Sequence, residues 1–215
     1  MLSRLREEQN NAYYITKPVV YSKESEISNE DIDQCFNFAH GMTFGAEGEH
    51  RDHRSGGRHK RKNGELFINT FQGKIAEFAF YRFLEKEGID SERPDTSQYS
   101  LGIWDNYDLS VKECIINIKS TKHYGNLLLL ETTDWNSEAE YIPNLEIDNN
   151  HNYDCFVFLR LSPDGEKLMK SQRFLYENSV STNELKKLIK SVKWEYDIPG
   201  YITRELLKEA IKGNY

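Results

Sequence analysis

The sequence has no apolar run long enough to cross a membrane and no apolar stretch near its first residue. A membrane-spanning helix needs about 18 or more consecutive apolar residues. The first eight residues, MLSRLREE, mix apolar with charged side chains and lack the apolar region of a secretory signal. We therefore expect a protein without a membrane partner that is not exported.

Cysteine is also scarce, at three residues in 215. Cys35, Cys114 and Cys155 are far apart and odd in number, and two of them lie in apolar runs. This usage predicts buried thiols in a reducing compartment, rather than a disulfide framework or a zinc site. Aromatic residues are not scarce: they reach 13% of the chain, beside 38% hydrophobic residues, which favours a folded domain over a disordered chain.

Positive charge is scarce overall, since the net charge is −7, but it is concentrated in one place. The stretch 51–63 has six basic residues against one acid, a net charge of +5, so the rest of the chain carries −12. A local basic block in an acidic chain can still bind phosphates. The alternative is a solvated loop. The basic residues concerned are Arg51, Arg54, Arg58, Lys60, Arg61 and Lys62.

The spacing of apolar residues predicts two helices before any strand. One covers about 29–41, with Ser28 or Asn29 as its N-cap, and the stronger one covers about 69–87. The Gly-, His- and Arg-rich segment 42–64 between them is predicted to be a long loop. A helix is also expected from about 182, and a last helix at 203–212 after a loop at 198–200.

Strand patterns follow the second helix. We predict strands at 107–111, 115–120, 127–130 and 153–161, the third of them wholly apolar. This order predicts an α/β fold with a mixed central β-sheet flanked by helices. We expect one domain over 1–215, with its core at about 65–195 and an inserted segment at 131–152 that contacts either bases or a second subunit.

Four polar side chains are predicted to meet on this sheet. Asn117 and Lys119 are two residues apart on one strand, so they share a face, and the step back to Asp108 fits a hairpin-like return. Glu77 lies on the preceding helix. Carboxylates bind Mg²⁺, and a lysine stabilises negative charge that develops on a phosphate.

These residues resemble the PD-(D/E)xK nuclease superfamily, in particular the type II restriction endonucleases. The resemblance rests on Asp108, on Asn117-Ile118-Lys119 and on Gly73–Glu77 within a helix, and it extends over about 70–161. It implies a restriction-endonuclease-like core in which Asp108 and Glu77 bind the metal, the carbonyl of Ile118 adds an oxygen ligand and Lys119 is catalytic. It also implies Mg²⁺, replaceable by Mn²⁺, as cofactor.

The resemblance further implies a type II site-specific deoxyribonuclease of a restriction-modification system, in the cytoplasm of a prokaryotic cell. Its partners would be double-stranded DNA and a second identical subunit. We expect DNA contacts from the six basic residues of 51–62 and from Lys122. Three other functions stay open: a DNA-binding module on the same fold that does not cleave, a structure-specific nuclease of repair or recombination, and an unrelated α/β protein whose basic loop binds anions.

Asn117 departs from the family pattern, which has Asp or Glu at this position. An amide offers an oxygen but no charge. Three outcomes follow: Glu77 supplies the missing acid, Glu113 does so, or the chain binds DNA without cutting it. Each residue also has an ordinary structural explanation. Asp108 can belong to a turn, Lys119 can be an exposed charge on an edge strand, and Glu77 can pair with Lys74 or Arg82.

Overall fold

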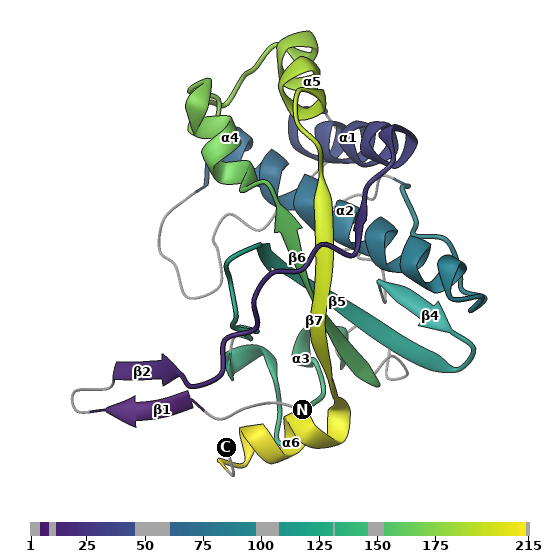
Figure 1. Cartoon of the computed structure of the whole chain (residues 1–215), viewed down its shortest axis with the longest axis vertical. Helices are drawn as coiled ribbons and strands as arrows, with labels where there is room; N and C mark the ends of the chain where they lie inside the picture. Colours follow the sequence, from purple (N-terminus) through teal and green to yellow (C-terminus); the bar gives the residue numbers. More distant parts are fainter. Residues whose placement is uncertain are drawn as a thin grey trace.

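The computed structural model describes residues 5–8, 12–45, 61–97, 108–130, 132–145 and 153–213. It is an α/β structure built on a mixed five-stranded sheet with the strand order β3-β7-β6-β5-β4, flanked by helices (Figure 1). Only β5 and β6 run parallel, and every other neighbouring pair in the described sheet is antiparallel. The predicted fold class is therefore confirmed.

The elements have the following bounds. The strands are β1 (Leu5–Glu8), β2 (Ala12–Ile15), β3 (Ser25–Glu26), β4 (Leu109–Val111), β5 (Cys114–Lys122), β6 (Cys155–Ser162) and β7 (Glu195–Thr203). The helices are α1 (Asn29–Phe44), α2 (Asn63–Lys86), α3 (Ile142–Leu145), α4 (Gly165–Ser171), α5 (Thr182–Lys190) and α6 (Arg204–Ile211), with a 3₁₀ turn, η1, at Thr132–Asp134. None of the helices in the described ranges combines the length and the apolar character that crossing a membrane requires.

Helix α1 packs on α2, and α2 packs on strands β5 and β6 of the sheet. Of the two N-caps predicted for α1, the structure has Ser28, whose hydroxyl accepts a hydrogen bond from the N–H of Asp31. Asp31 is itself buried and binds Arg82 of α2 through both carboxylate oxygens, at 2.8 and 3.0 Å. This ion pair joins the two helices where they cross. Arg82 is therefore paired with Asp31 and not with Glu77.

The two faces of the sheet bury two separate apolar clusters. Ile116 and Ile118 of β5 belong to the larger cluster, together with the apolar side of α2. Ile115 packs against the smaller cluster, which contains Trp135 and Phe156. Because successive side chains of a strand point to opposite faces, β5 presents its odd-numbered residues to the face that α2 does not cover.

Two predictions about strands are wrong. Leu127–Leu130 forms no strand and pairs with none of the five strands of the described sheet. The predicted loop 198–200 lies inside β7. Pro199 is tolerated there because the β6–β7 pairing is irregular between Phe158 and Arg160, so no regular ladder hydrogen bond is required of it.

Helix boundaries also differ from the prediction. After β6 the chain leads into α4, which the sequence analysis did not predict and whose N-cap is Asp164, since its carboxylate accepts the N–H of Lys167 at 3.2 Å. Of the predicted loop 42–64, the first residues continue α1 and the last begin α2, while residues 46–60 lie outside the described residues. The predicted insertion contains η1 and α3, and its parts at 131 and 146–152 also lie outside them.

Candidate active site on strands β4 and β5

Asp108 lies immediately before β4 and is hydrogen-bonded to the neighbouring strand β5. Its Oδ2 accepts a hydrogen bond of 2.6 Å from the backbone N–H of Ile118. The odd-numbered residues of β5 hydrogen-bond to the β6 side, as Ile115 does with the N–H of Asp154, so the N–H of Ile118 points towards β4. Asp108 therefore takes the place of a backbone acceptor just beyond the end of the β4–β5 pairing.

Asn117 lies next to this hydrogen bond. The β4–β5 register pairs Leu109 with Ile116, and extending it by one residue places Asp108 opposite Asn117. The Asn117 side chain is buried, and its Oδ1 has no hydrogen-bond partner in the described part of the chain. A buried acceptor without a donor is costly and uncommon, so this oxygen is a strong candidate for a ligand of a bound cation.

Lys119 follows two residues after Asn117 and leaves the strand on the same face. It is partly buried, and no hydrogen bond or ion pair joins it to another described residue. Its charge nevertheless acts on Asp108. The structure thus brings Asp108, Asn117 and Lys119 together, as the sequence predicted.

Glu77 belongs to a buried ion pair on α2. Its Oε2 lies 2.5 Å from Nζ of Lys74, one turn earlier, and both side chains are almost fully enclosed. Nζ of Lys74 also lies 4.7 Å from the centre of the Phe38 ring. Of the two structural partners considered for Glu77, the structure selects Lys74, and the pair is buried rather than on the surface. Glu77 belongs to α2, which packs on the face of β5 that carries Ile116 and Ile118, whereas Asn117 and Lys119 leave β5 on the other face.

The pKa of Asp108 is raised above its ordinary value by burial. The charge of Lys119, the N–H of Ile118 and the charge of Lys74 act in the opposite direction and favour the carboxylate. Burial has the larger effect. Lys74, which the sequence suggested only as a surface partner for Glu77, is therefore a member of the electrostatic environment of the site.

The oxygen atoms at this site are of the kinds that bind a hard cation, but they do not come from a cluster of acidic side chains. Among the residues that the structure describes, no three His, Cys, Asp or Glu side chains are grouped around one potential metal position. The donors available are the Asp108 carboxylate, the unpartnered Oδ1 of Asn117 and the carbonyl of Ile118, which leaves the backbone on the same side as its N–H. Carboxylate, amide and carbonyl oxygens are the ligands that Mg²⁺ accepts.

The predicted DNA-binding residues are placed only in part. Lys122 is engaged within the protein, at 2.9 Å from Glu166 and 3.5 Å from Asp164, so a phosphate contact would have to compete with these acids. Arg61 and Lys62 lie immediately before α2. The other predicted contacts, Arg51, Arg54, Arg58 and Lys60, lie outside the described residues.

The sequence prediction missed Arg160, the one fully buried arginine in the described part of the chain. Its guanidinium forms a bidentate ion pair with the carboxylate of Asp197 on β7, with N···O distances of 2.5 and 2.8 Å. Its remaining N–H groups donate to the carbonyls of Val19, Val20 and Gly125. The sequence could not predict this buried ion pair, because Arg160 is a single arginine near the end of an apolar strand and its partners come from distant parts of the chain.

Comparisons with protein-family models, with curated proteins and with solved structures found no match to this chain.

Proposed function

We propose that this chain is a Mg²⁺-dependent endonuclease for double-stranded DNA, of the type II restriction kind, with its reactive centre on β4 and β5. The observation that supports the proposal is the carboxylate of Asp108 held on the strand that carries Lys119, beside the buried and unpartnered Oδ1 of Asn117. An acid, an oxygen donor and a lysine converging at the end of a strand pair suit the hydrolysis of a phosphodiester.

Each residue has a distinct role in the proposed reaction. Asp108, Asn117 and the carbonyl of Ile118 hold the cation, which when bound polarises the phosphoryl oxygen and lowers the pKa of a coordinated water. Lys119 orients the attacking water and stabilises the negative charge that develops on the phosphate. Glu77 is the second acid of the proposal, and in the structure Lys74 holds its carboxylate in place.

The second candidate function is a DNA-binding module on the same fold that does not cleave. It is favoured by the amide at Asn117, where the family pattern has an acid, and by the engagement of Glu77 with Lys74. Both features lower the negative charge available to a divalent cation. This module would bind DNA with a strong dependence on salt and leave it intact at any concentration of Mg²⁺ or Mn²⁺.

One experiment separates the two functions. The full chain is incubated with supercoiled plasmid and with phage DNA, in Mg²⁺, in Mn²⁺ and in EDTA. The endonuclease gives discrete fragments with either metal and none in EDTA. A Lys119→Ala variant should lose this cleavage, while Lys187→Ala, at an exposed lysine on α5, should keep it. Intact DNA under all conditions, together with binding, would select the non-cleaving module.

A further inference from the structure

Helix α4 and the turn after it carry three cationic side chains that have no acidic partner. Lys167, Lys170 and Arg173 are all exposed, and none of them forms an ion pair with another described residue. On α5, by contrast, Lys186 and Lys190 both pair with an acid of α1. In a chain with 35 acidic and 28 basic residues, cations that stay unpaired are available to an external anion.

The turn after α4 is fixed to the start of α2, where the basic block of the sequence ends. The N–H of Gly64 donates to the carbonyl of Glu177 at 2.9 Å, and α4 itself lies beside the first turns of α2 (Figure 1). Arg61 and Lys62, the last two cations of the basic block, immediately precede this bond. The α4 surface is defined here as Lys62, Lys167, Lys170 and Arg173.

Two exposed tyrosine rings hold cations of this surface in place. Nζ of Lys167 lies 5.4 Å from the centre of the Tyr124 ring, and Nζ of Lys170 lies 5.8 Å from that of Tyr176. The Tyr124 hydroxyl donates to Asp164 at 2.8 Å, which fixes the orientation of the ring. A ring positions an ammonium group without neutralising it, so less ordering is required when a phosphate binds.

The backbone at Arg173 is better suited to glycine than to arginine. Its φ is +62°, in the left-handed region, and its N–H donates to the carbonyl of Lys170 at 3.0 Å, at the end of α4. Helices commonly end with glycine in this conformation, because a side chain there is strained. The arginine therefore indicates a role for its exposed, charged side chain.

The spacing of the cations fits a phosphate backbone. Residues 167–178 contain three cations and one acid, Glu177. Lys167 and Lys170 are three residues apart and share one side of α4. The step from Lys167 to Arg173 covers about 9 Å along the helix, which is the axial rise of two to three phosphates of one DNA strand, at about 3.4 Å each.

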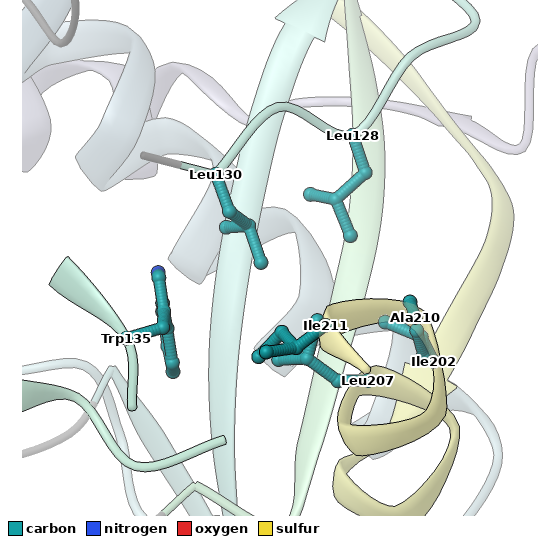
Figure 2. Close-up of a pocket in the computed structure, with 7 residues that line it drawn as sticks. All are labelled: Leu128, Leu130, Trp135, Ile202, Leu207, Ala210 and Ile211. Atoms are coloured by element: carbon teal, nitrogen blue, oxygen red, sulfur yellow. The ribbon is translucent and has the colours of Figure 1, made fainter. Parts of the chain in front are cut away.

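The apolar pocket of the protein does not suit such a partner. The pocket has a volume of about 440 Å³ and is lined by Leu128, Leu130, Trp135, Ile202 and residues of α6 (Figure 2). No charged side chain lines it. A polyanion is bound by cations at its contact surface, which α4 offers and this pocket does not.

We propose that the α4 surface contacts the phosphate backbone of DNA and extends the basic block 51–62 into one interface. The choice of DNA as the polyanion rests on the proposed function, whereas the unpaired charge of α4 does not. None of the four side chains belongs to the reactive centre on β4 and β5. Contacts to phosphate carry no sequence information, so this surface positions the duplex and does not select the cleavage site.

Fluorescence anisotropy of the full chain with a labelled duplex, in EDTA and over a series of salt concentrations, tests the proposal. The variant Lys167→Ala, Lys170→Ala, Arg173→Gly should bind more weakly than the wild type. Its slope of log affinity against log salt should fall by about 2.7, which is about 0.9 for each of three lost contacts.

The matched control removes the same charge from α5 and the residues after it, as Lys187→Ala, Lys190→Ala, Lys193→Ala, at three exposed lysines. This control should keep the wild-type slope. An unchanged slope in the α4 variant, or an equal fall in the control, would overturn the proposal.

Thermal melting separates the loss of a contact from the loss of the fold. Arg173→Gly alone should melt at or above the wild-type temperature, because glycine adopts a φ of +62° without strain, and it should still lower the slope by about 0.9. A wild-type slope in this single variant would contradict a phosphate contact by Arg173.

Binding in EDTA does not require cleavage, so the surface and the proposed function can fail separately. A chain that binds through α4 but leaves DNA intact in Mg²⁺ refutes the endonuclease and supports the surface. Cleavage by a chain whose α4 variant keeps the wild-type slope refutes the surface and supports the endonuclease. Binding of the wild type to vesicles of anionic phospholipid, but not to DNA, would refute both.

Discussion

The carboxylate of Asp108 accepts the backbone N–H of Ile118 at 2.6 Å, which ties the first acid of the site to the strand that carries Lys119. One oxygen of Asp108 thus has a structural role. The same bond also aims the carboxylate at the place where Asn117 and the carbonyl of Ile118 offer oxygens. The structural role of Asp108 is therefore compatible with its proposed role as a metal ligand.

Asp108→Asn should stabilise the protein at neutral pH and abolish cleavage. Burial raises the pKa of Asp108 in the folded state, so ionisation of this group costs folding free energy once the pH exceeds its pKa. The amide avoids that cost and keeps an acceptor for Ile118. Thermal melting should show the largest gain at neutral pH and none at low pH, where the acid is protonated.

Asp90→Asn, at an exposed position after α2, is the matched control and should change neither melting nor cleavage. An Asp108→Asn protein that melts below the wild type at neutral pH would contradict the assigned effect of burial. One that still cleaves plasmid at the wild-type rate would remove Asp108 from the reactive centre.

Asn117→Asp should increase the affinity for Mg²⁺ by about tenfold, because affinity for a hard cation rises with the number of charged oxygen ligands. The substitution keeps an oxygen at the position of the unpartnered Oδ1. The dependence of melting temperature on Mg²⁺ concentration measures binding, and plasmid cleavage at low Mg²⁺ measures its effect on activity. Asn183→Asp, exposed on α5, controls for the added charge. Weaker Mg²⁺ binding by Asn117→Asp would show that the site depends on a neutral amide.

Lys74 and Glu77 should be strongly coupled in stability. Removing one partner of a buried ion pair costs about 3–5 kcal/mol, because the other charge is left unpaired, whereas replacing both by apolar residues costs far less. Lys74→Met and Glu77→Leu should each destabilise the chain, and the double variant that combines them should recover most of the loss. Urea denaturation of the four proteins gives the coupling energy.

The same double variant separates structure from catalysis at Glu77. If Glu77 supplies the acid that Asn117 lacks, the double variant folds stably and does not cleave. Cleavage by this variant at the wild-type rate would show that Glu77 contributes only its ion pair with Lys74.

Replacing the six basic residues of 51–62 by alanine should weaken DNA binding and reduce its salt dependence. Each phosphate contact that is lost lowers the slope of log affinity against log salt by about 0.9. Fluorescence anisotropy with a duplex, over a series of salt concentrations, measures this slope. A control that replaces Lys187, Lys190 and Lys193, all exposed elsewhere, should keep the wild-type slope. An unchanged slope in the first variant would place the DNA interface on another part of the chain.

Local patterns were sufficient for most helices and for the central strands. The apolar spacing of α2, the cap at Ser28 and the alternation in β5 depend on residues close in sequence, and each was predicted near its observed position. Predictions from local sequence patterns were wrong where tertiary structure overrode the local preference. Leu127–Leu130 is a wholly apolar run of the kind that buried strands have, but it pairs with no strand of the described sheet, and Pro199 lies within a strand at an irregular pairing.

By itself the sequence determined the α/β class and the meeting of Asp108, Asn117 and Lys119, because strand alternation and a short return between neighbouring strands set both. Only the tertiary structure decided that Glu77 pairs with Lys74, that Oδ1 of Asn117 is buried without a partner, and that Arg160 joins Asp197 to the carbonyls of Val19 and Val20. These facts depend on burial and on contacts between residues distant in sequence, and neither composition nor periodicity encodes them.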